Sequence, residues 1–256
     1  MIGLFDSGIG GLTVVRELLR QAPRASFVYL GDSARYPYGN KSKATIEQYA
    51  VQDAAFLLSQ GATSLVVACN TASALAMDAL RAAFPNVPIY GVIETAVDEA
   101  LVVTQGRVGV IGTRATIGSS AYQETLKAKS KKHLEIFAQA CPLFVPLVEE
   151  GWLHDMETKR IAKHYLQPLR ADAVDTLILG CTHYPWLAEM IQRYMGKKTT
   201  LVNPAASVIR RVLAEQGADE EAKQRYFFTD VSPHSIEIAQ RWIGSPVTVE
   251  LATLGA

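Results

Sequence analysis

The chain has 256 residues, its 25 Lys and Arg balance 25 Asp and Glu, and 49% of its residues are hydrophobic. At about 150 residues per domain, this length is too great for one minimal domain and too small for three. The zero net charge argues against binding to nucleic acid or to an anionic membrane through bulk charge, because both need a basic excess. Three cysteines, an odd number, do not make a disulfide framework.

No segment has the pattern of a targeting signal or a membrane span. The first residues, MIGLFDSGIGG, lack the basic segment and the long apolar run of a secretory signal. The most apolar stretch, 65–80, is interrupted by Asn70, Thr71, Ser73 and Asp78, which argues against a transmembrane helix. We therefore expect a cytoplasmic protein whose thiols stay reduced.

Short runs rich in Val, Ile and Leu alternate along the chain with longer amphipathic stretches. The predicted strands are Ile2–Phe5, Phe27–Leu30, Leu65–Ala68, Ile89–Ile93, Val108–Ile111, Leu177–Leu179 and Leu201–Val202. The predicted helices include Leu12–Gln21, Lys43–Gln60, Ala72–Phe84, Thr158–Leu169 and Ala205–Gln216. Buried strands that alternate with helices are typical of parallel sheets built from βαβ units, so we expect an α/β fold.

Two patterns occur twice, in the same order and at similar spacing. IGLFDS at 2–7 resembles VGVIGT at 108–113, and SLVVACNT at 64–71 resembles TLILGCTH at 176–183. Buried strands look alike, so a chance match is the alternative. A true repeat predicts two similar α/β halves, each with a cysteine at the carboxyl end of a strand, where ligands bind in open α/β sheets. A substrate between the halves would meet one thiol from each side.

Cys69 and Cys181 each follow an apolar run and precede polar residues. This places each thiol where a strand gives way to a loop or a helix N-terminus, and a helix N-terminus lowers the pKa of a thiol. A buried cysteine that only packs is the alternative for either one alone. Two cysteines at matching positions favour reactive thiols. Cys141 has no such counterpart, and we expect it to be structural.

Two glycine-containing loops are candidate binding segments. Residues 6–11, DSGIGG, close the first predicted strand and open a helix, where backbone N–H groups bind carboxylate or phosphate. Their glycine spacing differs from a dinucleotide fingerprint, and a tight strand–helix turn is the alternative. Residues 31–39, GDSARYPYG, follow the second predicted strand and could cover a pocket, the alternative being a solvated loop with packed tyrosines.

Two further groups have a simple interpretation from the residues alone. Glu149 and Glu150 follow an apolar run, and adjacent carboxylates are usually a solvated edge. His183 lies two residues after Cys181, and strand alternation would turn both side chains to the same side. A histidine after a strand is often only a satisfied polar residue. The Cys and His spacings do not suit zinc, so we expect no metal site.

Five segments resemble, in order, the motifs of bacterial glutamate racemases: FDSGIGG at 5–11, GDSARYPYG at 31–39, ACNTAS at 68–73, FVPLVEEG at 144–151 and GCTHYP at 180–185. The resemblance implies a cofactor-independent isomerase that interconverts L- and D-glutamate for peptidoglycan synthesis. It also implies two pseudo-symmetric α/β domains, 1–93 plus 206–256 and 94–205, with the active site between them. A homodimer is usual in that family and is expected here.

The same resemblance implies roles for individual residues. Cys69 and Cys181 match the two catalytic acid/base thiols of the family. Asp6, Glu149 and His183 match positions that tune these thiols or carry their protons. Substrate contacts are implied at Asp6, Ser7, Tyr38, Gly39, Asn70, Thr71, Thr113, Thr116, Thr182 and His183.

The sequence leaves other activities as alternatives to this one. An aspartate racemase of the same superfamily commonly has His and Glu where this chain has Ser73 and His183, which favours glutamate. The family's usual Val-Glu-Pro is Ile-Glu-Thr here, ending at Thr95, where no proposed acid/base residue lies.

A serine esterase is suggested by GDS at 31–33, but it needs D-x-x-H, and His234 lies one position too far from Asp230. A non-catalytic amino-acid-binding module is a further alternative. Pyridoxal phosphate is not indicated, since no lysine occupies a convincing site.

Overall fold

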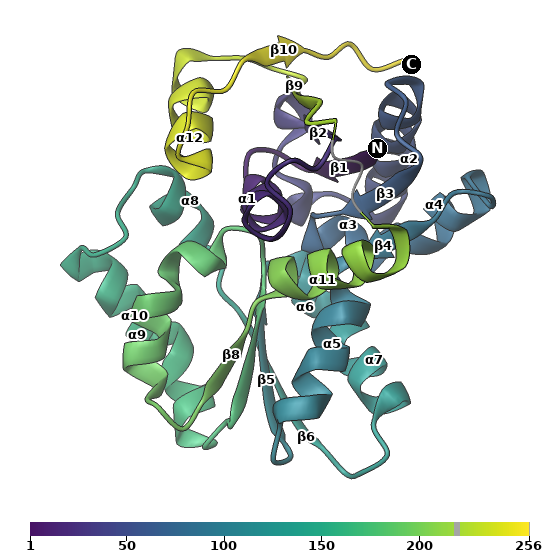
Figure 1. The fold of residues 1–256 in the computed structure, drawn as a ribbon. Helices are drawn as coiled ribbons and strands as arrows, with labels where there is room; N and C mark the ends of the chain where they lie inside the picture. The colour runs from purple at the N-terminus through teal and green to yellow at the C-terminus, as the bar shows by residue number, and fades with distance from the viewer. Residues whose placement is uncertain (218–220, 256) are drawn as a thin grey trace. The chain divides into compact units, whose positions relative to one another are not determined.

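The computed structural model describes residues 1–217 and 221–255. They form two compact units, Met1–Val92 with Ala205–Ala256, and Ile93–Pro204. Each unit is built on a parallel sheet with helices packed on it (Figure 1). The expected α/β class is therefore confirmed.

The first unit contains a six-stranded parallel sheet in the order β10-β9-β2-β1-β3-β4. Its strands are β1 (Ile2–Asp6), β2 (Phe27–Gly31), β3 (Ser64–Val67), β4 (Ile89–Gly91), β9 (Gln224–Phe228) and β10 (Val249–Leu251). Its helices are α1 (Leu12–Gln21), α2 (Lys43–Ser59), α3 (Asn70–Leu75), α4 (Met77–Ala83), α11 (Pro204–Gln216) and α12 (Pro233–Ile243), with short 3₁₀ turns η1 (Ser33–Arg35) and η2 (Tyr38–Asn40). Helix α2 covers one face of the sheet, and α1 and α12, which pack together, cover the other (Figure 1).

The core of the first unit explains the continuous apolar runs in its strands. Every residue of β1, β2 and β3 is buried, as expected where helices cover both faces of a parallel sheet. Phe5, Leu30 and Val67 belong to one cluster with Ala54 and Leu57 of α2. Each fully buried large side chain of this kind stabilises the fold by about 1.5–3 kcal/mol.

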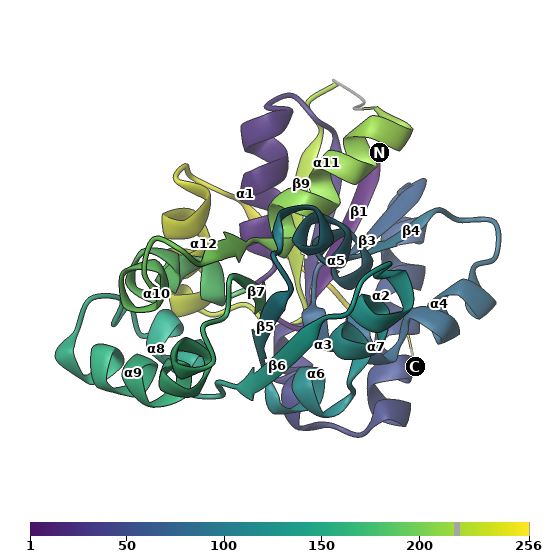
Figure 2. The same ribbon diagram turned by 90° about the horizontal axis from the view of Figure 1, so that it is seen from below.

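The second unit contains a four-stranded parallel sheet in the order β6-β5-β7-β8. Its strands are β5 (Arg107–Gly112), β6 (Glu135–Ala140), β7 (Thr176–Gly180) and β8 (Thr200–Val202). Its helices are α5 (Val92–Val103), α6 (Arg114–Gly118), α7 (Ala121–Lys129), α8 (Phe144–Glu149), α9 (Met156–Ala171) and α10 (Ala188–Met195), with the 3₁₀ turn η3 (Tyr184–Leu187). Figure 2 shows α9 and α10 on one side of this sheet and α5, α6 and α7 on the other.

The sequence repeat corresponds to a structural repeat. The order β2-β1-β3-β4 in the first unit recurs as β6-β5-β7-β8 in the second. Ile2 pairs with Ser64 across β1 and β3, and Val108 pairs with Thr176 across β5 and β7. These are the positions that align in the two sequence patterns, so the repeat extends to strand register.

One predicted strand is too long. The apolar run 89–93 ends as a strand at Gly91, because Gly91 pairs with Val67, the last residue of β3. Val92 starts α5 instead, and its N–H donates to the Ser73 hydroxyl at 3.3 Å. Thr95 lies in the first turns of this helix.

One predicted helix is divided, and some elements were missed. The helix expected over 72–84 breaks at Ala76 into α3 and α4. Ala76 and Leu80 are both fully buried, so the apolar pattern continues through the break and does not reveal it. Strand β6 was missed because it is an edge strand with no fully buried residue, which leaves it a mixed polar sequence. Within the described ranges, no helix combines the length and the apolar character needed to cross a membrane.

Candidate active site

Two clusters of residues each contain one thiol. The first, called the Cys69 group, consists of Cys69, Ser7 and Asp6 and lies at the carboxyl ends of β1 and β3. Cys69 directly precedes α3, and its Sγ accepts a hydrogen bond from the Ala72 N–H at 3.5 Å. The thiol donates to the Ser7 hydroxyl at 3.7 Å. Phe5 and Val67 are register partners two residues earlier on each strand, so strand pairing itself brings Ser7 beside Cys69.

Asp6 places a buried carboxylate beside this thiol. Its side chain accepts a hydrogen bond from the Gly8 N–H at 3.1 Å, and the Tyr29 hydroxyl donates to the Gly8 carbonyl at 2.6 Å. A Cβ at Gly11 would lie 2.5 Å from the Cβ of Asp6, so glycine is required there for the carboxylate to fit. The DSGIGG segment therefore forms a tight strand–helix turn, which was the alternative interpretation of its sequence. The turn also positions the buried side chain of Asp6.

The environment of Cys69 raises the pKa of its thiol to about 12. Burial is the largest cause and the negative charge of Asp6 the second, while hydrogen bonds from Ala72 and Ser7 act in the opposite direction. The lowered pKa expected from a helix N-terminus is therefore wrong for Cys69. These hydrogen bonds do not compensate for the loss of water and a neighbouring carboxylate. The thiol rests protonated at neutral pH.

The second cluster, called the Cys181 group, consists of Cys181, His183 and Glu149 and lies at the carboxyl end of β7. Cys181 follows Gly180, the last residue of that strand, and its Sγ lies 3.9 Å from Nδ1 of His183. Nε2 of His183 lies 3.0 Å from Oε1 of Glu149 at the end of α8. The three side chains form a chain from thiol to imidazole to carboxylate.

Two simpler interpretations of these residues are wrong. Strand alternation does not relate Cys181 to His183, because β7 has ended and His183 has helical backbone angles where it precedes η3. The two carboxylates of the Glu149–Glu150 pair are not both solvated. Helix α8 directs Glu149 toward His183, whereas Glu150 is exposed.

His183 is charged at neutral pH. Burial lowers its pKa, but hydrogen bonds with Cys181 and Glu149, and the negative charges of these groups, outweigh burial and raise the pKa to about 10. Both ring nitrogens of an imidazolium are donors, so one faces the sulfur and the other the carboxylate. A cation at this distance stabilises a negative sulfur atom.

Buried hydroxyl and amide residues follow both cysteines directly in the chain. Asn70 and Thr71 form the first turn of α3, directly after Cys69, and are buried. Thr182 directly follows Cys181 and is also buried. In the second unit, Thr113 caps α6, and its Oγ1 accepts from the Thr116 N–H at 3.1 Å.

Strand register relates the position of Thr113 to that of Cys181. Gly112 pairs with Gly180 across β5 and β7, so Thr113 and Cys181 directly follow paired residues. Ser7 and Cys69 stand in the matching relation after β1 and β3. The repeat thus gives each unit a hydroxyl residue and a cysteine that follow two neighbouring strands at corresponding positions.

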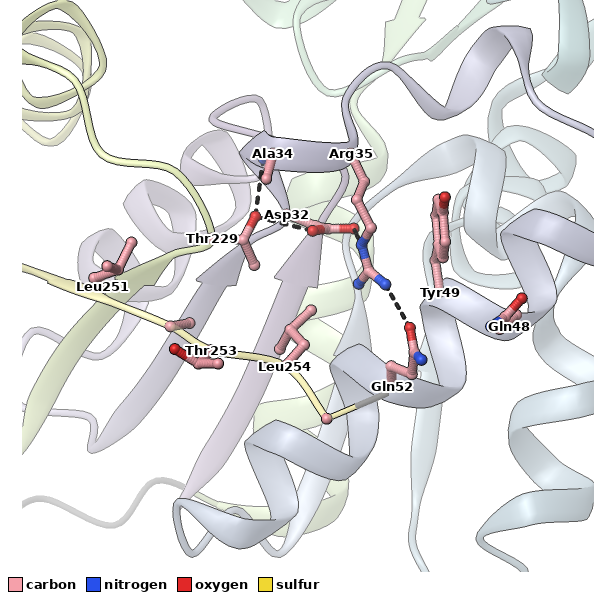
Figure 3. Close-up of a pocket in the computed structure, with 12 residues that line it drawn as sticks. Asp32, Ala34, Arg35, Gln48, Tyr49, Gln52, Thr229, Leu251, Thr253 and Leu254 are labelled. Atoms are coloured by element: carbon pink, nitrogen blue, oxygen red, sulfur yellow. Dashed lines mark hydrogen bonds and ion pairs between the residues drawn. The ribbon is translucent and has the colours of Figure 1, made fainter.

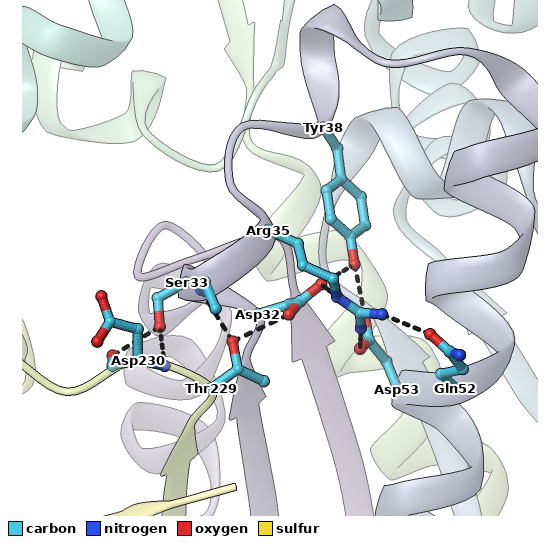
Figure 4. A network of polar contacts seen from close by, with 9 residues as sticks. Asp32, Ser33, Arg35, Tyr38, Gln52, Asp53, Thr229 and Asp230 are labelled. Carbon is cyan, nitrogen blue, oxygen red and sulfur yellow. Dashed lines mark hydrogen bonds and ion pairs between the residues drawn. The ribbon is translucent and has the colours of Figure 1, made fainter. Parts of the chain in front are cut away.

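Tyr38 begins the 3₁₀ turn η2 after the second strand. Its ring is fully buried, and its hydroxyl is hydrogen-bonded to the carboxylates of Asp32 and Asp53 (Figure 4). Gly39 follows it in η2. Sequence reasoning missed Asp53, although its position in the chain carries a signal. It is an acidic residue on the face of α2 that buries Ala50, Ala54 and Leu57.

Ser33 of the GDS sequence closes a loop. Its hydroxyl donates to the Asp230 carbonyl at 2.7 Å and accepts from the Asp230 N–H at 2.9 Å (Figure 4). A hydroxyl whose proton goes to a backbone carbonyl lacks the general base of an esterase nucleophile. The geometry does not support the esterase.

A pocket of about 520 Å³ lies elsewhere in the first unit (Figure 3). Arg35, Tyr49 and Gln52 line one side, and residues 251–255 line the other. Its described lining residues include neither Cys69 nor Cys181, so it is separate from both thiol groups. Across the part of the chain that the structure describes, no three His, Cys, Asp or Glu residues are grouped to hold a metal ion.

Comparison with known proteins gives one consistent family. Residues 2–212 match the family model for Asp/Glu/hydantoin racemases. A glutamate racemase of Geobacter metallireducens is 44% identical over 252 residues, which cover 95% of this chain and 92% of that protein. A glutamate racemase isoform from Bacillus anthracis has a crystal structure that matches with a TM-score of 0.93 and 35% identity, over 99% of this chain and 97% of that one. The Francisella tularensis glutamate racemase, solved in complex with D-glutamate, matches with a TM-score of 0.90 and 34% identity, over 98% and 97%.

Proposed function

We infer that this chain, which belongs to the Asp/Glu/hydantoin racemase family, interconverts L- and D-glutamate without a cofactor. The observation that carries this conclusion is its similarity to glutamate racemases over nearly its whole length. The product D-glutamate is supplied to peptidoglycan synthesis. The chain is an isomerase that binds glutamate.

Two thiols meet the chemical requirement of this reaction. Racemisation removes the α-hydrogen from one face of the substrate and delivers a proton to the other. A single base that cannot cross the substrate plane returns the proton to the face it came from. Cys69 and Cys181 therefore act on opposite faces of one α-carbon, one as thiolate and the other as thiol.

The two environments favour one starting arrangement of protons. The raised pKa of Cys69 keeps that thiol protonated, which makes it the acid. Cys181 lies beside the His183 imidazolium and is the base. The α C–H bond breaks as its proton goes to the Cys181 sulfur, and the S–H bond of Cys69 breaks as its proton goes to the opposite face. The reverse reaction exchanges these roles.

The charged neighbours have supporting roles. Glu149 keeps His183 protonated, and His183 stabilises the Cys181 thiolate. Asp6 disfavours a thiolate at Cys69 and so promotes its return to the protonated form.

The remaining polar groups bind the substrate. The α-carboxylate and the carbanion next to it are stabilised by hydrogen-bond donors, and such fixed donors are a large term in catalysis. The donors and contacts assigned to this role are Ser7, Tyr38, Gly39, Asn70, Thr71, Thr113, Thr116 and Thr182. A cytoplasmic location and a homodimer belong to the same proposal, and the family resemblance supports both.

The test is solvent exchange at the α-carbon. L-glutamate in deuterium oxide, without added cofactor, is expected to gain deuterium and lose optical rotation with the wild-type protein. The Cys69→Ala and Cys181→Ala variants are each expected to abolish racemisation. Cys141→Ala is the matched control, since it also removes a buried free thiol and is expected to keep activity.

Three results would contradict these assignments. Full activity of either single variant at Cys69 or Cys181 would exclude two-thiol catalysis. An absence of deuterium in glutamate with the wild-type protein would exclude the racemase itself. Racemisation of L-aspartate in preference to L-glutamate would change the substrate.

A further inference from the structure

A buried polar cluster in the first unit has no hydrogen bond to Cys69 among the described contacts. We call Asp32, Arg35, Tyr38, Asp53 and Thr229 the Asp32–Asp53 cluster (Figure 4). Both carboxylates are fully buried, while the Arg35 side chain is 20% exposed and also lines the pocket of Figure 3. The cluster joins the loop after β2 to helix α2 and to the end of β9.

The Tyr38 hydroxyl has two acceptors and one proton. Its oxygen is within hydrogen-bond distance of Oδ2 of Asp32, and it lies 2.9 Å from Oδ2 of Asp53. If both carboxylates were ionised, one of these contacts would set unshared electron pairs against each other. Such a contact is costly in a buried site, since the groups have no water to bind instead. The geometry therefore requires a second proton in the cluster.

Asp32 already has donors for both oxygens. Its Oδ2 accepts from Nε of Arg35 at 2.6 Å and from Tyr38, and its Oδ1 accepts from the Thr229 hydroxyl at 2.9 Å. The Thr229 oxygen accepts from the Ala34 N–H, which leaves its proton for Asp32. Asp32 is thus the ionised carboxylate and forms an ion pair with Arg35.

Asp53 has a donor for only one oxygen. Its Oδ1 accepts from Nη2 of Arg35 at 2.8 Å. Among the residues that the structure describes, its Oδ2 is hydrogen-bonded to Tyr38 alone. A proton on this oxygen satisfies every contact: Asp53 donates to Tyr38, and Tyr38 donates to Asp32. The cluster then has no net charge, because Arg35 balances Asp32.

We propose that Asp53 is a neutral carboxylic acid that donates a hydrogen bond to Tyr38 and is a positioning residue for the loop 33–40. Burial raises the pKa of Asp53, and the negative charge of Asp32 raises it further. The titratable and charged groups that face Asp53 are Asp32, Arg35, Tyr38 and, farther away, Tyr29.

The loop that Asp53 holds packs against the turn of the Cys69 group. The Asp32 N–H donates to the Asp6 carbonyl at 2.9 Å. A Cβ at Gly8 would lie 3.1 Å from the Tyr36 ring, so this ring covers the residue next to Ser7. The effect on catalysis rests on the proposed function, in which Tyr38 and Gly39 contact glutamate. The protonation of Asp53 does not depend on it.

The first test is the pH dependence of the melting temperature of Asp53→Asn. The amide reproduces the neutral acid, because its oxygen accepts from Arg35 and its NH₂ donates to Tyr38. In the unfolded wild-type chain Asp53 ionises near pH 4, whereas in the folded chain it keeps its proton. Ionisation of Asp53 therefore favours the unfolded wild-type chain as pH rises above about 4, and the free energy of unfolding of the wild type falls. The Asp53→Asn variant has no carboxyl group at this position and does not lose this free energy. The Tm of the variant relative to wild type is expected to rise by about 5 °C or more between pH 5 and pH 8.

The matched control is Glu47→Gln on the same helix. Glu47 is partly exposed beside Lys43, so its Tm difference from wild type is expected to stay constant over this range. A constant difference for Asp53→Asn as well would overturn the proposal, because it would show Asp53 ionised in the folded protein. Infrared difference spectra give a second measurement. The carbonyl band of a protonated carboxyl group is expected at pH 7 in the wild type and not in Asp53→Asn, and its absence from the wild type would also overturn the proposal.

The positioning role is tested by kinetics at pH 7. Asp53→Ala leaves Tyr38 without its donor and is expected to raise KM for glutamate about fivefold to tenfold with kcat nearly unchanged. Asp53→Asn is expected to keep both constants within about twofold. An unchanged KM in Asp53→Ala, or equal damage in the two variants, would refute positioning by this hydrogen bond. A wild-type protein without racemase activity would refute the proposed function, while the melting data would still decide the state of Asp53.

Discussion

Replacing Glu149 by Gln tests the electrostatics of the Cys181 group directly. The change removes the carboxylate 3.0 Å from Nε2 of His183 and preserves the size of the side chain. A hydrogen bond to a charged group contributes about 1.5–3 kcal/mol. One pKa unit corresponds to about 1.4 kcal/mol. The pKa of His183 is therefore expected to fall from about 10 to between about 8 and 9.

Nuclear magnetic resonance of protein labelled at histidine measures this value. The His183 signal is assigned by its loss in His183→Gln and is followed from pH 6 to pH 11 in wild type and variant. Glu150→Gln is the matched control, because it removes the same charge from the adjacent, exposed position. The control is expected to leave the midpoint of His183 near 10.

Activity should follow the same titration. In Glu149→Gln the imidazolium beside Cys181 is lost at lower pH, so racemisation is expected to decline above about pH 8–9, where the wild type remains active. Two results would refute the reasoning. One is an equal midpoint in Glu149→Gln and Glu150→Gln. The other is a wild-type His183 that titrates near its ordinary value of 6.5.

Two predictions concern the Cys69 group. Asp6→Asn removes a negative charge that raises the pKa of Cys69, so the ultraviolet absorbance of the Cys69 thiolate is expected to develop at lower pH than in the wild type; an unchanged or higher midpoint would contradict this. Gly11→Ala forces a Cβ to within 2.5 Å of Asp6 and is expected to lower the free energy of unfolding in urea. The loss expected from such overpacking is about 1–3 kcal/mol. Gly118→Ala is the control, since a Cβ there meets open space, and equal losses in both variants would argue against the steric explanation.

Most strand positions could be predicted from the residues in order. A central parallel strand is buried on both faces, so β1, β3, β5 and β7 are continuous apolar runs that local sequence reveals. The repeated pattern around Cys69 and Cys181 likewise placed both thiols directly after such strands. The same reasoning failed for β6, whose edge position leaves it exposed and polar. The predicted boundaries of two domains and the assigned substrate contacts remain predictions.

What the sequence by itself determined is the set of features that depend on near neighbours: the α/β alternation, the two thiols at strand ends and the DSGIGG turn. Only the tertiary structure decided the charges around them. Glu149 meets His183 from a distant helix, Asp53 meets Tyr38 across a loop, and burial with Asp6 reverses the expected pKa of Cys69. The physical reason is that desolvation and Coulomb energy depend on distances in space, and residues far apart in the chain set those distances.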